Sequence, residues 1–198
     1  MTDRAKPSPQ NRDEVEIKLP CESLDDVRER LRSANATSVS PRHFESNDLY
    51  DNAAGQIAGS GSTLRLRRTK AEALLTYKGP ARFEEGIKRR EERETVVSDA
   101  AEMEAILAGL GFTRSFRYEK HREEWRLENC LIALDQTPIG DFVEVEGDPS
   151  SIRRAVASLK LDSSEAIPYS YSKLYALRRQ KEPSLPKDMV FAGGASLS

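Results

Sequence analysis

Charged and apolar residues alternate in many short segments of this chain. Near the start, charged residues stand at positions 14, 16 and 18, and apolar residues stand at 15, 17 and 19. Successive side chains of a β-strand point to opposite faces, so this segment predicts a strand with one charged face and one apolar face. A half-buried strand with its charges in water gives the same pattern, and one segment alone does not separate the two cases.

The alternation recurs along the chain and predicts seven further strands. Residues 88–94 are all charged, so periodicity does not distinguish strand from helix there, and Thr95, Val96 and Val97 favour a strand. Residues 53–62 are rich in Gly and Ala and predict a loop or hairpin connection. The predicted strands cover residues 14–19, 39–49, 63–67, 74–78, 88–97, 118–125, 130–135 and 142–146.

Apolar residues spaced three and four apart predict helices between these strands. Ser23 and Asp99 are candidate N-caps for the first two, and Pro149 stands in the first turn of the third. The predicted helices cover residues 23–31, 98–111, 149–161 and 170–177. Polar segments that contain proline and lack periodicity flank this pattern. We therefore expect a flexible leader over residues 1–12, one domain over residues 13–180 and a flexible tail over residues 181–198.

These elements predict an α+β protein with about eight mainly antiparallel strands and three or four helices. If one face of each strand points into a closed barrel, with helices packed outside, the interior collects fourteen charged side chains. They are Glu14, Glu16, Lys18, Arg65, Arg67, Lys78, Arg90, Glu92, Glu94, Lys120, Arg122, Asp135, Glu144 and Glu146. Because a buried unpaired charge costs several kcal/mol, such an interior requires water, metal ions and a highly charged ligand. The alternative is a purely structural barrel whose charges point to solvent.

The residue types of this interior indicate its chemistry. Carboxylates are the ligands that Mg²⁺ and Mn²⁺ prefer. Arginine and lysine side chains bind phosphate oxygens, and the guanidinium group does so with two parallel hydrogen bonds. The combination predicts a site for a metal ion and a polyphosphate.

Composition excludes several other classes of protein. The chain has 198 residues, of which 37% are hydrophobic, and carries 31 basic and 33 acidic residues for a net charge of −2. This balance argues against a general binder of nucleic acids or anionic membranes. Cys21 and Cys130 lack the spacing of a zinc site or a disulfide framework, and no apolar run is long enough to span a bilayer. We therefore expect a cytoplasmic protein with reduced thiols.

Seven short motifs, in this order, resemble those of the CYTH domain, the family of triphosphate tunnel metalloenzymes that includes class IV adenylate cyclases and thiamine triphosphatases. The resemblance spans about residues 13–178. It implies an eight-stranded tunnel in which basic residues hold a triphosphate and glutamates hold a divalent metal. The motifs are Glu14-x-Glu16-x-Lys18, Leu64-Arg65-Leu66-Arg67, Thr76-Tyr77-Lys78-Gly79-Pro80, Arg90-x-Glu92-x-Glu94, Lys120-x-Arg122, Leu134-Asp135 and Phe142-Val143-Glu144-Val145-Glu146.

The resemblance also implies roles for individual residues, with Mg²⁺ or Mn²⁺ as the cofactor. The implied metal ligands are Glu14, Glu16, Glu92, Glu94, Glu144 and Glu146. The implied triphosphate-binding residues are Lys18, Arg65, Arg67, Lys78, Arg90, Lys120 and Arg122. Glu14, Glu16, Lys18 and Lys78 are the implied catalytic residues.

Two reactions agree with such a site, and the motifs favour the first. A class IV adenylate cyclase converts ATP into cyclic AMP and pyrophosphate, and the first and third motifs resemble this cyclase-named bacterial branch. A triphosphatase hydrolyses tripolyphosphate or an organic triphosphate, but Leu49 stands where the thiamine triphosphatases are expected to have a tyrosine. A non-catalytic polyphosphate-binding module is a third hypothesis. It would retain the basic residues but lose the metal-binding carboxylates. The expected partner is ATP or another small triphosphate, and a homodimer is left open.

Overall fold

The computed structural model describes residues 13–193. In this part of the chain nine strands and five α-helices follow one another, with a short 3₁₀-helix, η1, at Ser163–Glu165. The strands are β1 Asp13–Cys21, β2 Thr37–Asn52, β3 Thr63–Arg68, β4 Ala73–Lys78, β5 Arg82–Glu84, β6 Ile87–Val97, β7 Phe112–Leu127, β8 Cys130–Thr137 and β9 Gly140–Glu146. The helices are α1 Leu24–Ser33, α2 Gln56–Gly59, α3 Ala100–Gly109, α4 Pro149–Ser158 and α5 Tyr171–Lys181.

Eight of the nine strands described in residues 13–193 form a closed ring of antiparallel pairs. The order is β1-β9-β8-β7-β2-β3-β4-β6, and the ring closes where β6 pairs with β1. The long strand β6 makes this closure possible, because residues 92–97 pair with β4 and residues 88–91 pair with β1. The short strand β5 pairs with residues 87–89 of β6. The predicted α+β class and antiparallel arrangement are therefore confirmed.

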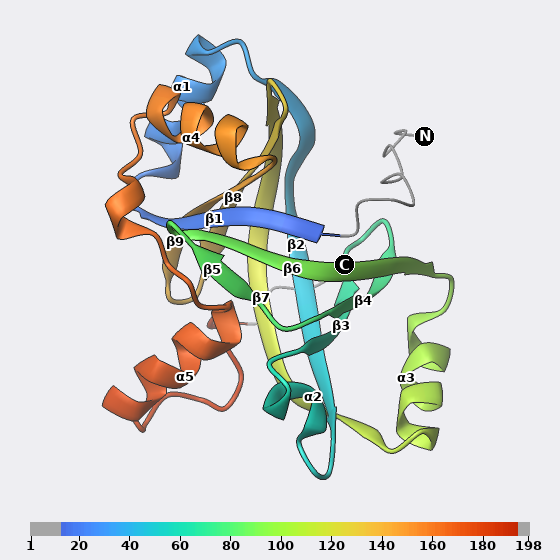
Figure 1. The fold of residues 1–198 in the computed structure, drawn as a ribbon. Coiled ribbons are helices and arrows are strands. Elements are labelled where there is room, and N and C mark those ends of the chain that lie inside the picture. Colours follow the sequence, from blue (N-terminus) through green and yellow to red (C-terminus); the bar gives the residue numbers. More distant parts are fainter. Residues whose placement is uncertain (1–12, 194–198) are drawn as a thin grey trace.

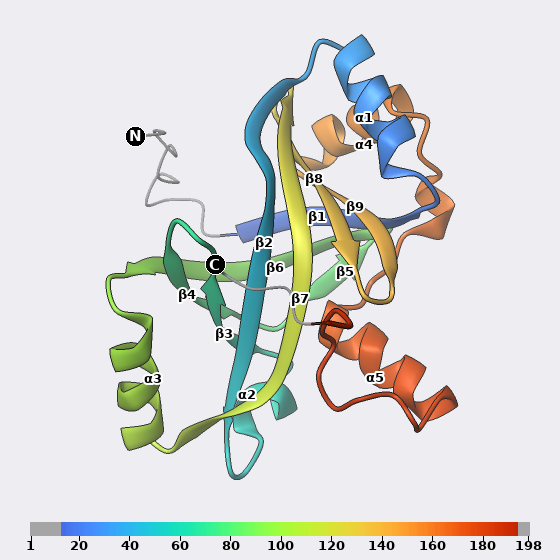
Figure 2. The same cartoon turned by 180° about the vertical axis from the view of Figure 1, so that it is seen from behind.

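The outer face of the ring is apolar where helices cover it. Figure 1 shows α1 and α4 side by side over β1, β8 and β9, and Figure 2 shows the same arrangement from behind. Val27 and Leu31 of α1 and Ile152 of α4 are buried in one cluster with Ile17 of β1 and Val145 of β9. These strand residues belong to the predicted apolar faces. Helix packing therefore turns the charged faces of β1 and β9 towards the interior of the ring.

The segment after α5 packs against strand β7. Met189 is fully buried and forms a parallel bridge with Tyr118 of β7, where the Met189 N–H donates to the carbonyl of Arg117 at 2.9 Å. Met189 belongs to a second apolar cluster with Tyr171 and Tyr175 of α5. Residues 182–193, which fall in the expected tail, thus include a segment docked on the sheet. The expected leader, residues 1–12, and residues 194–198 lie outside the described part of the chain.

Several predicted boundaries are corrected. Strands β2 and β7 extend well beyond residues 39–49 and 118–125, because the two pair with each other along most of their length. The predicted loop over residues 53–62 contains the short helix α2, which the carboxylate of Asp51 stabilises by accepting hydrogen bonds from the backbone N–H groups of Ile57 and Ala58. Strand β5 was not expected, since its three residues are too few for an alternating pattern to identify a strand.

Candidate functional site

A large charged cavity lies inside the ring. Its volume is about 1230 Å³, and thirty residues from β1 to β9 and from the start of α5 line it. All thirteen predicted site residues are among them: Glu14, Glu16, Lys18, Arg65, Arg67, Lys78, Arg90, Glu92, Glu94, Lys120, Arg122, Glu144 and Glu146. The structure therefore brings the whole predicted set together at one place, and the alternative with its charges on the outside of the ring is wrong.

Strands β1, β4 and β6 contribute an ion-pair network around Glu14. Its carboxylate accepts from Lys78 Nζ at 2.5 Å and from Arg90 Nε at 2.7 Å. Lys78 also contacts Glu92 at 2.9 Å. Burial alone would raise the pKa of Glu14, but the charges of Lys78 and Arg90 hold it well below its usual value. Glu14 therefore stays ionised inside the ring.

A second network joins β1, β7, β8 and β9. Asp135, which is completely buried, accepts from Lys120 Nζ at 3.0 Å and from Arg122 Nε at 2.7 Å. Arg122 also bonds to Glu144, and Glu144 contacts Lys18 Nζ at 3.3 Å. The pKa of Glu144 would rise by burial but is held well below its usual value by Lys18 and Arg122. Each cation in this network already has a carboxylate partner.

Strand β3 contributes two arginines with unused hydrogen-bonding capacity. Arg65 contacts the hydroxyl groups of Tyr118 and Thr76 at 3.3 Å each, and Arg67 contacts Glu45 at 3.4 Å and Glu94 at 3.1 Å. The Nε atoms of both arginines are buried and have no hydrogen-bond partner in the described structure. A buried donor without a partner costs about 1–3 kcal/mol. These two groups therefore favour a site that accepts an anion.

Three glutamates of the cavity lie close enough to repel one another. Glu16 of β1 stands directly opposite Glu146 of β9, and Glu14 lies two residues before Glu16 in β1. Burial and the charges of Glu14 and Glu16 raise the pKa of Glu146 to about 7. A divalent cation would relieve this repulsion, so the donor set fits Mg²⁺ or Mn²⁺ in its chemistry. Within residues 13–193, however, no three acidic, histidine or cysteine side chains are arranged to hold a metal ion.

The other three predicted metal ligands are also paired with neighbouring groups, as Glu14 is with Lys78 and Glu16 is with Lys88. Glu92 contacts Lys78, Glu94 accepts from Thr76 Oγ1 at 2.7 Å and contacts Arg67, and Glu144 contacts Lys18. Of the six predicted metal ligands, Glu14 and Glu16 are those whose charges act most strongly on the pKa of Glu146.

Four interior residues that contact the predicted set were not predicted from the sequence. Lys88 bonds to Glu16. Its place in the interior was predictable, because it stands two positions before Arg90 on the same face of β6. Tyr118 was missed as an aromatic residue in a charged series. Glu45 was missed because both faces of β2 carry buried polar residues there, which removes the alternation. Tyr171 comes from α5, and no strand pattern could have placed it in the cavity.

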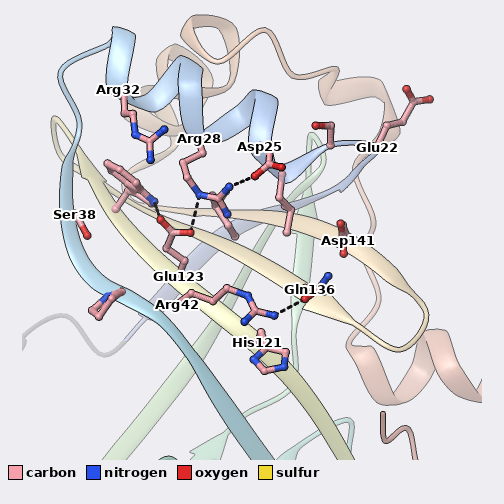
Figure 3. Close-up of a pocket in the computed structure, with 15 residues that line it drawn as sticks. Glu22, Asp25, Arg28, Arg32, Ser38, Arg42, His121, Glu123, Gln136 and Asp141 are labelled. Atoms are coloured by element: carbon pink, nitrogen blue, oxygen red, sulfur yellow. Dashed lines mark hydrogen bonds and ion pairs between the residues drawn. The ribbon is translucent and has the colours of Figure 1, made fainter. Parts of the chain in front are cut away.

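A second cavity, of about 840 Å³, lies on the outer face of the ring between α1 and strands β2, β7 and β8 (Figure 3). Its polar side chains pair largely with one another. Arg28 Nε donates to Glu123 at 2.9 Å, Trp125 Nε1 donates to Glu123 at 2.8 Å, and Arg42 donates to Gln136 at 2.6 Å. Among the described residues, none of the predicted site residues lines this cavity. Its contacts hold α1 on the sheet.

Comparison with known families agrees with the ring and its interior. The sequence model of the CYTH domain matches residues 12–166. The chain therefore belongs to the CYTH family. No curated protein matches its sequence.

Solved structures share the fold. A candidate adenylate cyclase from Vibrio parahaemolyticus is similar over 84% of this chain and 99% of that chain, with a TM-score of 0.74 and 20% identity. A protein from Pyrococcus horikoshii is also similar over 84% of this chain and 99% of that chain, with a TM-score of 0.69 and 26% identity. A candidate adenylyl cyclase from Hippeastrum, described as having a dominant triphosphatase activity, is similar over 87% of this chain and 97% of that chain, with a TM-score of 0.61 and 19% identity. At 19% and 20% identity the likeness concerns the fold alone.

Proposed function

We propose that this protein is a divalent-metal-dependent enzyme that acts on the triphosphate group of a small molecule inside the strand ring. The observation that carries the proposal is the set of cations on the cavity wall, where Arg65 and Arg67 keep buried Nε–H groups without a partner. Phosphate oxygens are the acceptors that such groups bind best. In this proposal the ring is a closed barrel, and its cavity is a tunnel open at both ends.

The carboxylates supply the second half of the proposal. Glu14, Glu16 and Glu146 would hold Mg²⁺ or Mn²⁺, with Glu92, Glu94 and Glu144 as further candidate ligands. When bound, the metal would neutralise phosphate charge and polarise the phosphorus–oxygen bonds. Lys18 and Lys78 would then contact the triphosphate and stabilise the charge that develops on the leaving group.

We infer that the reaction is the cyclisation of ATP. The ribose 3′-hydroxyl oxygen bonds to the α-phosphorus, the bond to the bridging oxygen of pyrophosphate breaks, and the hydroxyl proton is released. Room for a nucleoside supports this inference, because Leu49, Tyr118 and Tyr171 add an apolar part to a cavity of about 1230 Å³. The cyclase-type motifs around Glu14 and Lys78 support it as well.

Hydrolysis of tripolyphosphate or of an organic triphosphate is the second candidate. It needs the same cations and carboxylates but no nucleoside site, and water replaces the ribose hydroxyl as the nucleophile. The structural neighbour from Hippeastrum, described as having a dominant triphosphatase activity, gives this candidate its specific support. A non-catalytic binding module is a weaker third candidate, because the acidic group Glu14, Glu16 and Glu146 is present.

The proposed domain comprises residues 13–180, and the proposed location is the cytoplasm. Cys21 and Cys130 are free thiols, as we expect for a reducing compartment. In the described residues no helix has the length and apolar character needed to cross a bilayer.

Product analysis tests the proposed reaction. Purified protein is incubated with ATP and, separately, with tripolyphosphate, in the presence of Mg²⁺ or Mn²⁺, and the products are resolved by chromatography. We expect cyclic AMP and pyrophosphate from ATP. Orthophosphate, formed fastest from tripolyphosphate, would instead establish the triphosphatase. Tight binding without turnover would support the binding module.

Two variants on one strand link that activity to the cavity. Arg90→Gln removes a cation that faces the interior, whereas Arg93→Gln removes one on the outer face that pairs with Glu91. We expect Arg90→Gln to lower kcat/KM by about 10²-fold, as for loss of one charge-stabilising donor. Arg93→Gln should retain full activity, and equal losses in both variants would contradict the assigned site.

A further inference from the structure

The first residue of α5 reaches the cavity from outside the sheet. Tyr171 lines the cavity and is buried, although it lies beyond residue 166, where the match to the CYTH domain ends. No strand of the ring carries it. Its contacts therefore show what a segment outside the matched region adds to the site.

The ring of Tyr171 lies beneath the ammonium group of Lys18. Lys18 Nζ is 3.9 Å from the ring centroid, which is the geometry of a cation–π contact. The same nitrogen donates to the carbonyl oxygen of Tyr169 at 3.1 Å and contacts Glu144 at 3.3 Å. Two of the three groups that fix this ammonium therefore come from residues 169–171.

The hydroxyl group of Tyr171 acts on two more cations through one acceptor. It donates to Asp135 Oδ2 at 2.7 Å. The same oxygen accepts from Lys120 Nζ at 3.0 Å and from Arg122 Nη2 at 2.6 Å. Because Asp135 is completely buried, these side chains satisfy its carboxylate in place of water. The position and availability of Lys120 and Arg122 thus depend on how Asp135 is held.

We propose that Tyr171 is a positioning residue of the anion-binding site. Its ring sets the position of Lys18, and its hydroxyl group orients the Asp135 carboxylate that holds Lys120 and Arg122. The inference rests on the proposed function, because it assigns these three cations to the triphosphate. It adds that α5 completes a site whose cations all come from strands.

If Tyr171 had a purely structural role, its loss would lower stability without changing anion binding, and Tyr175 provides the comparison. Tyr175, one turn further along α5, is also buried, and its hydroxyl group donates to the backbone carbonyls of Pro186 and Asp188 at 3.0 Å and 3.2 Å. Tyr175 therefore anchors the helix without lining the cavity. Tyr171→Phe and Tyr175→Phe each remove one hydroxyl group from α5. Only Tyr171→Phe removes a hydrogen bond to the carboxylate that holds Lys120 and Arg122.

The experiment compares Tyr171→Phe, Tyr171→Leu and Tyr175→Phe with the unchanged protein. Binding of tripolyphosphate is measured by calorimetry in EDTA, which prevents turnover, and the melting temperature of each variant is recorded. We expect Tyr171→Phe to weaken binding about five- to tenfold, since one donor to a charged acceptor is lost. Tyr171→Leu should weaken it about fivefold more through loss of the cation–π contact. Tyr175→Phe should lower the melting temperature but leave the affinity unchanged.

A second readout needs no ligand. The ring face shields the terminal methylene protons of Lys18, so their NMR signals should be shifted upfield in the unchanged protein and in Tyr171→Phe, and should return to ordinary values in Tyr171→Leu. If the unchanged protein does not bind tripolyphosphate, the proposed function fails and the inference falls with it. If the unchanged protein binds and Tyr171→Phe binds equally well, or if the Lys18 signals do not respond to Tyr171→Leu, the inference alone is overturned.

Discussion

The neighbours of a titratable side chain inside the ring decide whether it remains charged. Glu14 and Glu146 are both glutamates on strands that pair with each other, yet their pKa values move in opposite directions. Lys78 and Arg90 overcome the effect of burial on the pKa of Glu14, whereas Glu14 and Glu16 add to the effect of burial on Glu146. The difference comes from which charges the neighbouring strands place opposite each carboxylate.

The raised pKa of Glu146 predicts a pH-dependent stability of the metal-free protein. Its pKa is near 4.5 in the unfolded chain and about 7 in the folded one, so the folded state binds the proton more tightly. Stability is therefore lost as the pH rises through this window. We expect Glu146→Gln to melt at the same temperature as the unchanged protein near pH 4.5 and about 2–4 °C higher above pH 7, because exposure to the cavity limits the effect to about 1 kcal/mol.

Thermal denaturation in EDTA at a series of pH values measures this difference. Glu29→Gln, which removes an exposed carboxylate from α1, is the control for the loss of one negative charge. A constant difference between Glu146→Gln and the unchanged protein would show that the neighbouring glutamates do not act on Glu146.

At the scale of elements, strand β1 shows how both faces of a ring strand can be buried. In β1 the apolar face packs under α1 and α4, and the charged face lines the cavity. Segments outside the sheet then fix the wall. The segment around Met189 docks on β7 and packs with Tyr118 and Tyr171, two aromatic residues of the cavity. The packing of the Met189 side chain and the geometry of the site are therefore linked through these two rings.

Met189→Ala tests that link. Met189 is fully buried, so truncation should destabilise the fold by about 2–5 kcal/mol through lost contacts and a cavity. Because Tyr118 and Tyr171 lose a packing partner, tripolyphosphate should also bind several-fold more weakly. Val190→Ala is the matched control. The side chain of Val190, next to Met189, is 38% exposed, so this substitution should change stability by less than about 0.5 kcal/mol. Chemical denaturation and calorimetry measure both effects, and an unchanged affinity for Met189→Ala would separate the segment from the site.

At the scale of the whole molecule, alternation along the sequence was sufficient to predict the thirteen charged residues that the cavity collects, but not the remaining interior residues or the pairing. Each of these thirteen residues lies on a strand face, which depends only on local spacing. Which carboxylate meets which cation depends on the register between strands far apart in sequence, as for Glu14 with Lys78. Tyr171 was not predicted either, because its place depends on how α5 docks on the ring and not on local spacing. Lys88, in contrast, was predictable from its spacing to Arg90.

The pairing has a consequence for how ligands bind. In the described structure Glu14 occupies Lys78 and Arg90, and Glu16 bonds to Lys88. A triphosphate that takes these cations must separate them from their carboxylates, and a buried carboxylate without a partner is costly. A divalent metal supplies a new partner for those carboxylates. The triphosphate and the metal should therefore bind with positive coupling, and each should tighten the other by the same factor.

We expect this factor to be about tenfold, within the usual range of such couplings. It is measured as the ratio of the Mn²⁺ affinity with tripolyphosphate to the Mn²⁺ affinity without it. Binding of Mn²⁺ to tripolyphosphate in buffer is subtracted first. Glu14→Gln removes the carboxylate that competes for Lys78 and Arg90, so this variant should bind tripolyphosphate more tightly in EDTA and show a smaller factor. Glu91→Gln, on the outer face of β6, should show the full factor. Equal factors in Glu14→Gln and Glu91→Gln would mean that the ion pairs around Glu14 do not couple the two ligands.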